Sequence, residues 1–130
     1  MGKNEIKIRV WDKEKKRMIY KNIQSLIFAH HGLVVEYHIP PMQSHLKVYD
    51  GIIMLSSGLF DEDGKEMYRG DICSNEVAKW EIIFDTGCFC GKRINGSDGT
   101  QNTHLALRAI RGLRIIGNIY ETPELLKTDI

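Results

Sequence analysis

Residues 5–11 read EIKIRVW, and this stretch is the clearest indicator of the fold class. Isoleucine and valine stand at its even positions and alternate with charged residues, which is typical of a β-strand with one buried face. The polar segment DKEKKR follows at positions 12–17, and an apolar run, MIY, resumes at positions 18–20. The first 20 residues therefore predict a β-hairpin.

Similar patterns continue along the chain. Residues 33–39 are rich in β-formers and follow Gly32, so they predict a second hairpin together with the apolar run at residues 23–29. A short helix is an alternative for Leu26–Phe28, because short apolar runs are ambiguous. Residues 77–84 read VAKWEIIF and predict a further strand.

The carboxyl-terminal third gives a mixed prediction. Residues 105–113 fit a helix and a strand equally well. Residues 114–120 predict a final strand, in which Gly117 marks a bulge or a close approach of backbone. Thr122 is a suitable cap for a short terminal helix that begins at Pro123.

Length and composition limit the class of protein. The chain has 130 residues, a net charge of +1, 42% hydrophobic and 27% charged residues, which fits one globular domain over residues 1–130 and argues against disorder. It contains no stretch of about 18 apolar residues and no secretory signal pattern, so we expect no membrane contact and a cytoplasmic location. Many short strands with regular turns favour a mainly β barrel or sandwich.

Three blocks of the sequence resemble the YopX family of bacteriophage and prophage proteins. They are IRVWD at 8–12 with MIY at 18–20, the segment from Gly58 to Ile72, and IGNIYE at 116–121 with PEL at 123–125. The resemblance implies a small, mainly β, barrel-like fold with a short helix in one connection, and a phage or prophage origin. It implies no reaction, because the family is functionally uncharacterised, and it supplies no catalytic residue or cofactor.

Within those blocks, several residues suit structural roles in turns and strand entries. Asp71 follows Gly70, so its carboxylate can accept backbone N–H groups in an Asx-type turn. The acidic residues near Gly64 lack the spacing of an EF-hand and indicate a polar turn. The residues that we assign to structural motifs are Trp11, Asp12, Gly64, Gly70, Asp71, Gly117 and Asn118.

The cysteines raise a zinc hypothesis. Cys88 and Cys90 are two residues apart and would lie on one face of a strand, where they also suit a role as small apolar residues. Cys73 and His104 could complete a ligand set, although structural zinc sites usually contain two close ligand pairs. We expect no metal at this site.

Two segments concentrate positive charge. Residues 3–21 contain eight Lys or Arg and three acidic residues, and residues 92–114 contain five and one. If these segments share a face, they form a nucleic-acid-binding surface on which Trp11 stacks and the basic residues contact phosphates. The residues of this hypothesis are Arg9, Trp11, Lys92, Arg93, Arg108 and Arg111.

The function that we expect from the sequence is binding of another macromolecule, without enzymatic activity. The preferred partner is protein, including a second copy of the chain as a homo-oligomer, because exposed strand edges favour association. Nucleic-acid binding through the basic segments is the first alternative. An enzyme with an unrecognised site is the second alternative.

Overall fold

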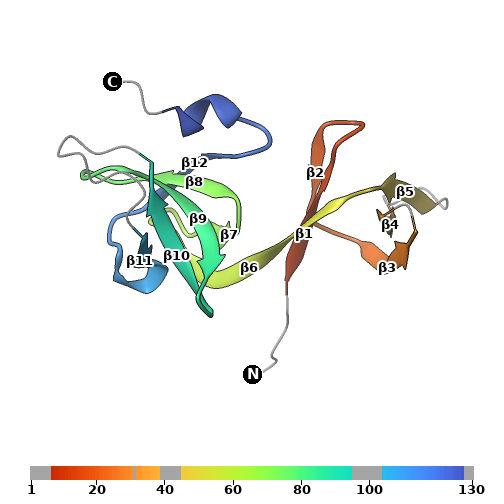
Figure 1. Cartoon of the computed structure of the whole chain (residues 1–130), viewed down its shortest axis with the longest axis horizontal. Coiled ribbons are helices and arrows are strands. Elements are labelled where there is room, and N and C mark those ends of the chain that lie inside the picture. Colours follow the sequence, from red (N-terminus) through yellow and green to blue (C-terminus); the bar gives the residue numbers. More distant parts are fainter. Residues whose placement is uncertain (1–6, 31, 39–44, 95–103, 128–130) are drawn as a thin grey trace. The chain divides into compact units, whose positions relative to one another are not determined.

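The computed structural model describes residues 7–30, 32–38, 45–94 and 104–127 (Figure 1). In these ranges the regular elements are strands and two short 3-10 helices, so the mainly β class is confirmed. The chain divides into two compact units, Met1–Leu55 and Ser56–Ile130, which are described separately. This division does not test whether residues 1–130 form one domain, which stays a prediction.

The first unit contains both predicted hairpins. Its strands are β1 (Ile8–Asp12), β2 (Arg17–Ile19), β3 (Ile23–Ala29), β4 (Gly32–His38), β5 (His45–Tyr49) and the start of β6 (Ile52–Phe60). β1 lies between β2 and β6, and the other three strands form a sheet in the order β3-β4-β5. The helical alternative for Leu26–Phe28 is therefore wrong, because β3 pairs with β4 through these residues.

A buried cluster holds the first unit together. It consists of Val10, Ile19, Val35, Tyr37 and Val48, from β1, β2, β4 and β5. The even positions of β1 thus supply the core, as the alternation predicts. Burial of a valine or isoleucine side chain contributes about 1.5–3 kcal/mol to folding, so this cluster stabilises the contact between the two sheets of the unit.

The second unit is a longer antiparallel arrangement. Its elements after β6 are β7 (Glu66–Tyr68), β8 (Asp71–Ser74), β9 (Lys79–Asp85), β10 (Cys88–Arg93), β11 (His104–Ala106), η1 (Leu107–Ala109), β12 (Arg114–Asn118) and η2 (Pro123–Leu126). Five of them form a curled sheet in the order β11-β10-β9-β8-β12 (Figure 1). The ambiguous segment at 105–113 therefore begins as a strand and continues as a 3-10 turn.

The core of the second unit lies on one face of this sheet. Trp80 and Ile82 project from β9 into a buried cluster with Met67, Cys73, Ala78, Leu107 and Leu113. Gly91 lies opposite Ile82 in the sheet, and a Cβ there would stand 2.4 Å from Ile110 Cδ1. The absence of a side chain at Gly91 is thus what lets the η1 segment pack closely on β10.

The buried carboxylates close turns. In the first unit, Asp12 Oδ1 accepts the N–H groups of Glu14 and Lys15 at 3.0 and 3.1 Å, which shapes the β1–β2 turn. In the second unit, Asp71 Oδ2 accepts the N–H of Tyr68 at 2.8 Å, across a turn that Gly70 forms with a φ of 94°. These carboxylates satisfy backbone donors that would otherwise be costly to bury.

Asp61 ties the β6–β7 turn to β12. Its Oδ1 accepts N–H groups from Asp63 and Lys65, and its Oδ2 accepts the N–H of Ile115 at 3.0 Å. Burial raises the pKa of Asp61, but these three donors lower it more, so its pKa lies below the ordinary value. Gly64 completes the turn with a φ of 79°, a conformation that favours glycine.

Gly117 marks both a bulge and a close approach. The register of β12 against β8 shifts between Ile115 and Gly117. A Cβ at Gly117 would lie 2.0 Å from Thr122 Oγ1, which leaves no space for one. Thr122 takes the predicted N-cap position of η2, but its hydroxyl group bonds the N–H and C=O of Asn118 and makes no cap hydrogen bond to η2.

Candidate functional site

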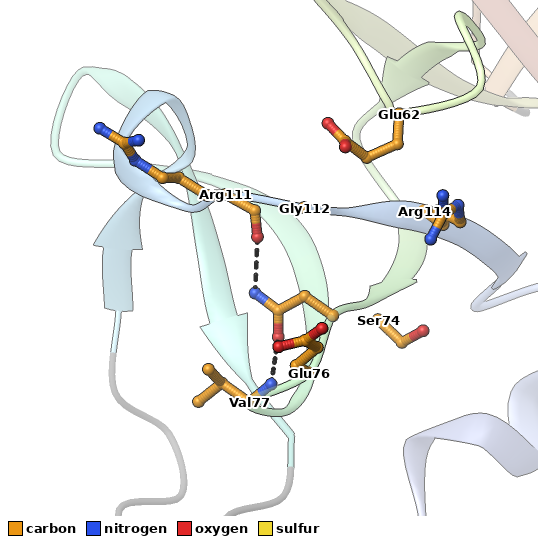
Figure 2. Close-up of a pocket in the computed structure, with 8 residues that line it drawn as sticks. Glu62, Ser74, Glu76, Val77, Arg111, Gly112 and Arg114 are labelled. Carbon is orange, nitrogen blue, oxygen red and sulfur yellow. Dashed lines mark hydrogen bonds between the residues drawn. The ribbon is translucent and has the colours of Figure 1, made fainter.

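A polar cleft of ≈ 550 Å³ lies in the second unit. Its size is within the range of small-molecule sites, about 300–1,000 Å³. Figure 2 shows the segments that line it: the β6–β7 turn, the β8–β9 turn and the chain that leads into β12. The lining residues are Glu62, Ser74, Asn75, Glu76, Val77, Arg111, Gly112 and Arg114.

Asn75 fixes one wall of this cleft. Its Oδ1 accepts the N–H groups of Val77 and Ala78, both at 3.0 Å, and its Nδ2 donates to the carbonyl of Arg111 at 2.9 Å. The indole N–H of Trp80 reaches the same Oδ1 at 3.2 Å. The wall is therefore anchored to the core through one amide side chain.

The charged groups of the cleft do not converge on one point. Figure 2 shows the guanidinium of Arg111 directed away from Glu62 and Arg114. Arg114 Nε forms an exposed ion pair with Asp63 Oδ1 at 3.5 Å. The cleft therefore contains both positive and negative side chains, and they do not point to one common position. This arrangement favours weak polar contacts over tight binding of one charged ligand.

A shallower groove of ≈ 420 Å³ lies in the first unit. It is lined by Arg17–Asn22 together with Tyr37 and His38. Arg17 Nη2 donates to the hydroxyl of Tyr37 at 2.7 Å, and His38 N–H bonds the carbonyl of Asn22 at 3.0 Å. The groove thus combines aromatic walls with cationic side chains.

Two residues of the nucleic-acid hypothesis are inaccessible. Arg9 is 1% exposed and Trp11 is 7% exposed, so neither can present a surface to a phosphate or a base in this structure. Arg9 instead donates to the hydroxyl of Tyr20 at 3.3 Å, with its guanidinium over that ring. Both faces of β1 are buried, whereas alternation alone indicates one buried face.

The other residues of that hypothesis lie in the second unit. Lys92 and Arg93 are half-buried on β10, and Arg93 stands over the indole of Trp80 at 5.8 Å. Arg108 and Arg111 are exposed around η1. Whether the basic segments of the two units share one face stays a prediction.

Sequence reasoning missed a better-placed group of basic residues. Lys15, Lys16, Arg17 and Lys21 are all exposed, and Tyr20 between them is 49% exposed. The signal was present, since these residues lie in the basic segment at 3–21. In the structure, the exposed positive charges of this segment lie in the β1–β2 turn, on β2 and just after it, and not on β1.

The outer strand β3 is the most unusual surface of the first unit. It lies at the end of the β3-β4-β5 sheet, and its seven residues, IQSLIFA, carry no charge. Natural edge strands usually carry lysine, proline or a bulge that opposes further pairing. Here the register shift is confined to the start of the strand, between Ile23 and Ser25.

An apolar row crosses the same sheet. Ile27 pairs with Val34, and Val34 pairs with Tyr49, so their side chains share one face. This face is opposite to the one on which Val35 and Val48 are buried. Ile27 and Tyr49 are 48% and 61% exposed, and Phe28, the next residue of β3, points to the other face and is 80% exposed.

The structure separates the four residues of the zinc hypothesis. Cys73 pairs with Trp80 and is buried in the core cluster. Cys88 and Cys90 lie on the other face of the sheet, with their Sγ atoms 3.6 Å apart. His104 Nδ1 contacts Asp85 Oδ2 at 3.2 Å. Within the described ranges no three potential ligands are grouped to hold a metal, so this four-residue set is not assembled.

The architecture defines a class of mainly β proteins built from short antiparallel strands in two units. The family model described as YopX protein matches residues 7–127, and the chain belongs to the YopX family. The crystal structure of protein EF1440 from Enterococcus faecalis has a similar fold, with a TM-score of 0.63 and 22% identity over 95% of this chain and 99% of that chain. None of the curated proteins matches the chain.

In the described ranges, no helix is long and apolar enough to cross a bilayer.

Proposed function

We propose that this YopX-family chain is a non-enzymatic accessory protein of a bacteriophage or prophage that binds another protein through β3 and the adjacent apolar row. The observation that carries the proposal is the uncharged outer strand next to the exposed side chains of Ile27, Phe28 and Tyr49. Exposed apolar groups of this kind commonly mark protein-binding surfaces.

The mode of binding follows from the backbone of β3. A strand at the edge of a sheet presents N–H and C=O groups to a further strand, and main-chain hydrogen bonds then supply the affinity. The partner would therefore contribute an extended segment with apolar side chains at alternate positions. A second copy of this chain meets that description, since pairing of two uncharged strands involves no charge repulsion.

A charge introduced at Ile27 tests the proposal. Ile27→Lys places an ammonium group in the apolar row without entering the buried cluster. The matched control is Phe60→Lys, which changes an exposed aromatic residue of the second unit. We expect the bound protein recovered from bacteria that carry the phage or prophage genome to fall at least 10-fold for Ile27→Lys and to stay unchanged for the control. Equal recovery with both variants would contradict the proposal.

Nucleic-acid binding is the second candidate, and a specific observation favours it. Arg17 and Lys21 line the groove that contains Tyr20, and Lys15 and Lys16 are exposed in the turn just before β2. Aromatic faces and nearby cations are the elements with which proteins bind single strands. Phosphate contacts make affinity fall steeply with salt, so we would measure binding of a labelled single-stranded oligonucleotide across salt concentrations.

The control for this second candidate is charge-matched. Neutralising Lys16 and Lys21 should weaken oligonucleotide binding and reduce its salt slope, because each lost phosphate contact lowers the slope by about 0.7 for a single strand. Neutralising Arg108 and Arg111 in the second unit should change neither quantity. Absence of binding at low salt would exclude this candidate.

A further inference from the structure

The thiols of Cys88 and Cys90 form a pair on the face of the sheet opposite to the core cluster. Trp80 faces that cluster and pairs with Arg93, whereas Cys90 stands three residues before Arg93 and points to the other side. The two Sγ atoms are 3.6 Å apart and both cysteines are free. Cys88 is exposed, so a solute can reach the pair from water.

The separation of the sulfur atoms suits chelation. Metal–sulfur bonds to zinc are about 2.3 Å long, and two such bonds at a tetrahedral angle place the sulfur atoms about 3.8 Å apart. The observed distance between the two Sγ atoms is 3.6 Å, and a small rotation of the exposed Cys88 side chain would bring it to that value. Thiolates select soft cations, whereas hard cations such as Mg²⁺ and Ca²⁺ prefer oxygen.

Further potential ligands lie on the same face. Asp85 pairs with Cys88, and His104 pairs with Lys92, which points to the same side as Cys90. The contact between His104 Nδ1 and Asp85 Oδ2, at 3.2 Å, is of the kind that orients a histidine for metal binding. The side chains of Asp85 and His104 are exposed and are not grouped with the two thiols. The two sulfur atoms are therefore the ligands that the structure already holds at a suitable distance.

We propose that Cys88 and Cys90 form a bidentate thiolate site for one thiophilic d¹⁰ cation, of the class that includes Cu⁺, Zn²⁺ and Cd²⁺. Each thiol loses one proton as its sulfur binds the cation, so two protons are released to water. Water or His104 completes the coordination. Cys73 takes no part, because it is buried on the other face.

Titration of the reduced full-length chain with Cd²⁺ tests this site, because thiolate-to-cadmium charge transfer gives an ultraviolet band. We expect one Cd²⁺ per chain, and we expect Cys88→Ser to lower the affinity at least 10-fold. The matched control is Cys73→Ser, which should keep the band and the affinity. Competition with Zn²⁺ and with Cu⁺ then identifies the cation that the site prefers.

Cys88 is exposed, so its replacement should leave the fold intact, and thermal unfolding of the variant verifies this. Two results would overturn the proposal: no stoichiometric band in the wild-type chain, or equal affinity in the wild-type and Cys88→Ser chains. Loss of the band in Cys73→Ser with retained folding would also contradict it, because that result would place the sulfur ligand on the core face.

Discussion

Cys73 and Cys90 lie on opposite faces of one sheet. Cys73 pairs with Trp80 of β9, and both side chains are buried in the core cluster, whereas Cys90 belongs to the register of Ile83 and Ala106 on the reverse face. The chemical consequence is that the three thiols fall into two groups, a core thiol and a pair of which Cys88 is exposed.

These groups should differ in reactivity. Burial, together with the charges of Asp71 and Asp61, raises the pKa of Cys73 to about 12, and burial and the neighbouring Cys88 raise the pKa of Cys90. Since the thiolate is the reactive form, we expect Cys88 to react first with a thiol reagent at neutral pH and Cys73 only on unfolding. Mass spectrometry of partially labelled chain measures this order, and early labelling of Cys73 would contradict it.

Gly117 should be intolerant of a side chain. Gly117→Ala places a Cβ against Thr122 Oγ1, which bonds both backbone groups of Asn118, so we expect a loss of about 1–3 kcal/mol in the free energy of unfolding. Urea denaturation measures the loss.

Thr122→Ala removes the nearest atom in conflict, Oγ1, and provides the control, whereas Leu125 Cδ1 would still lie 2.7 Å from the added Cβ. In a double-mutant cycle, the Gly117→Ala/Thr122→Ala chain should lose less stability than the two single variants combined. Additive losses would show that the contact with Thr122 Oγ1 is not the cause of the loss.

Asp61 should make the second unit sensitive to acid. Its pKa is lowered in the folded chain, so its stabilising effect is present above the unfolded value of about 3.9 and is lost as pH falls through the lower folded value. We therefore expect the free energy of unfolding to fall on acidification below about pH 4, and Asp61→Asn to reduce that dependence.

Asp61→Asn should also destabilise at neutral pH, by about 1–3 kcal/mol, because the amide NH₂ cannot accept the N–H of Ile115. Glu62→Gln, at the exposed neighbouring position, is the control and should leave both the stability and its pH dependence in place. Equal pH profiles for wild type and Asp61→Asn would contradict this role.

Much of the fold follows from local patterns. The hairpins at residues 8–19 and 23–38 were predictable because a period of two and a turn residue specify neighbouring strands. The close approach at Gly117 was predictable because glycine inside a strand lacks a packing role of its own. The common face of Cys88 and Cys90 follows from strand geometry alone.

The candidate sites were less predictable, because they depend on register between distant strands. The row of Ile27, Val34 and Tyr49 exists only once β3, β4 and β5 are aligned. The burial of Arg9 and Trp11 depends on which residues cover the second face of β1. The alternating pattern of residues 5–11 gives no information about that. Cys88 is exposed and Cys90 is buried because Cys88 lies at the start of β10, and the sequence alone does not show where that strand begins.

The central claim is that β3 contacts a protein. A photo-reactive phenylalanine analogue at Phe28, compared with the same analogue at the exposed Phe60, tests it in the cells that produce the protein. We predict covalent adducts with protein, another copy of the chain included, from position 28 and none from position 60. Adducts with nucleic acid alone, or equal protein adducts from both positions, would contradict the account.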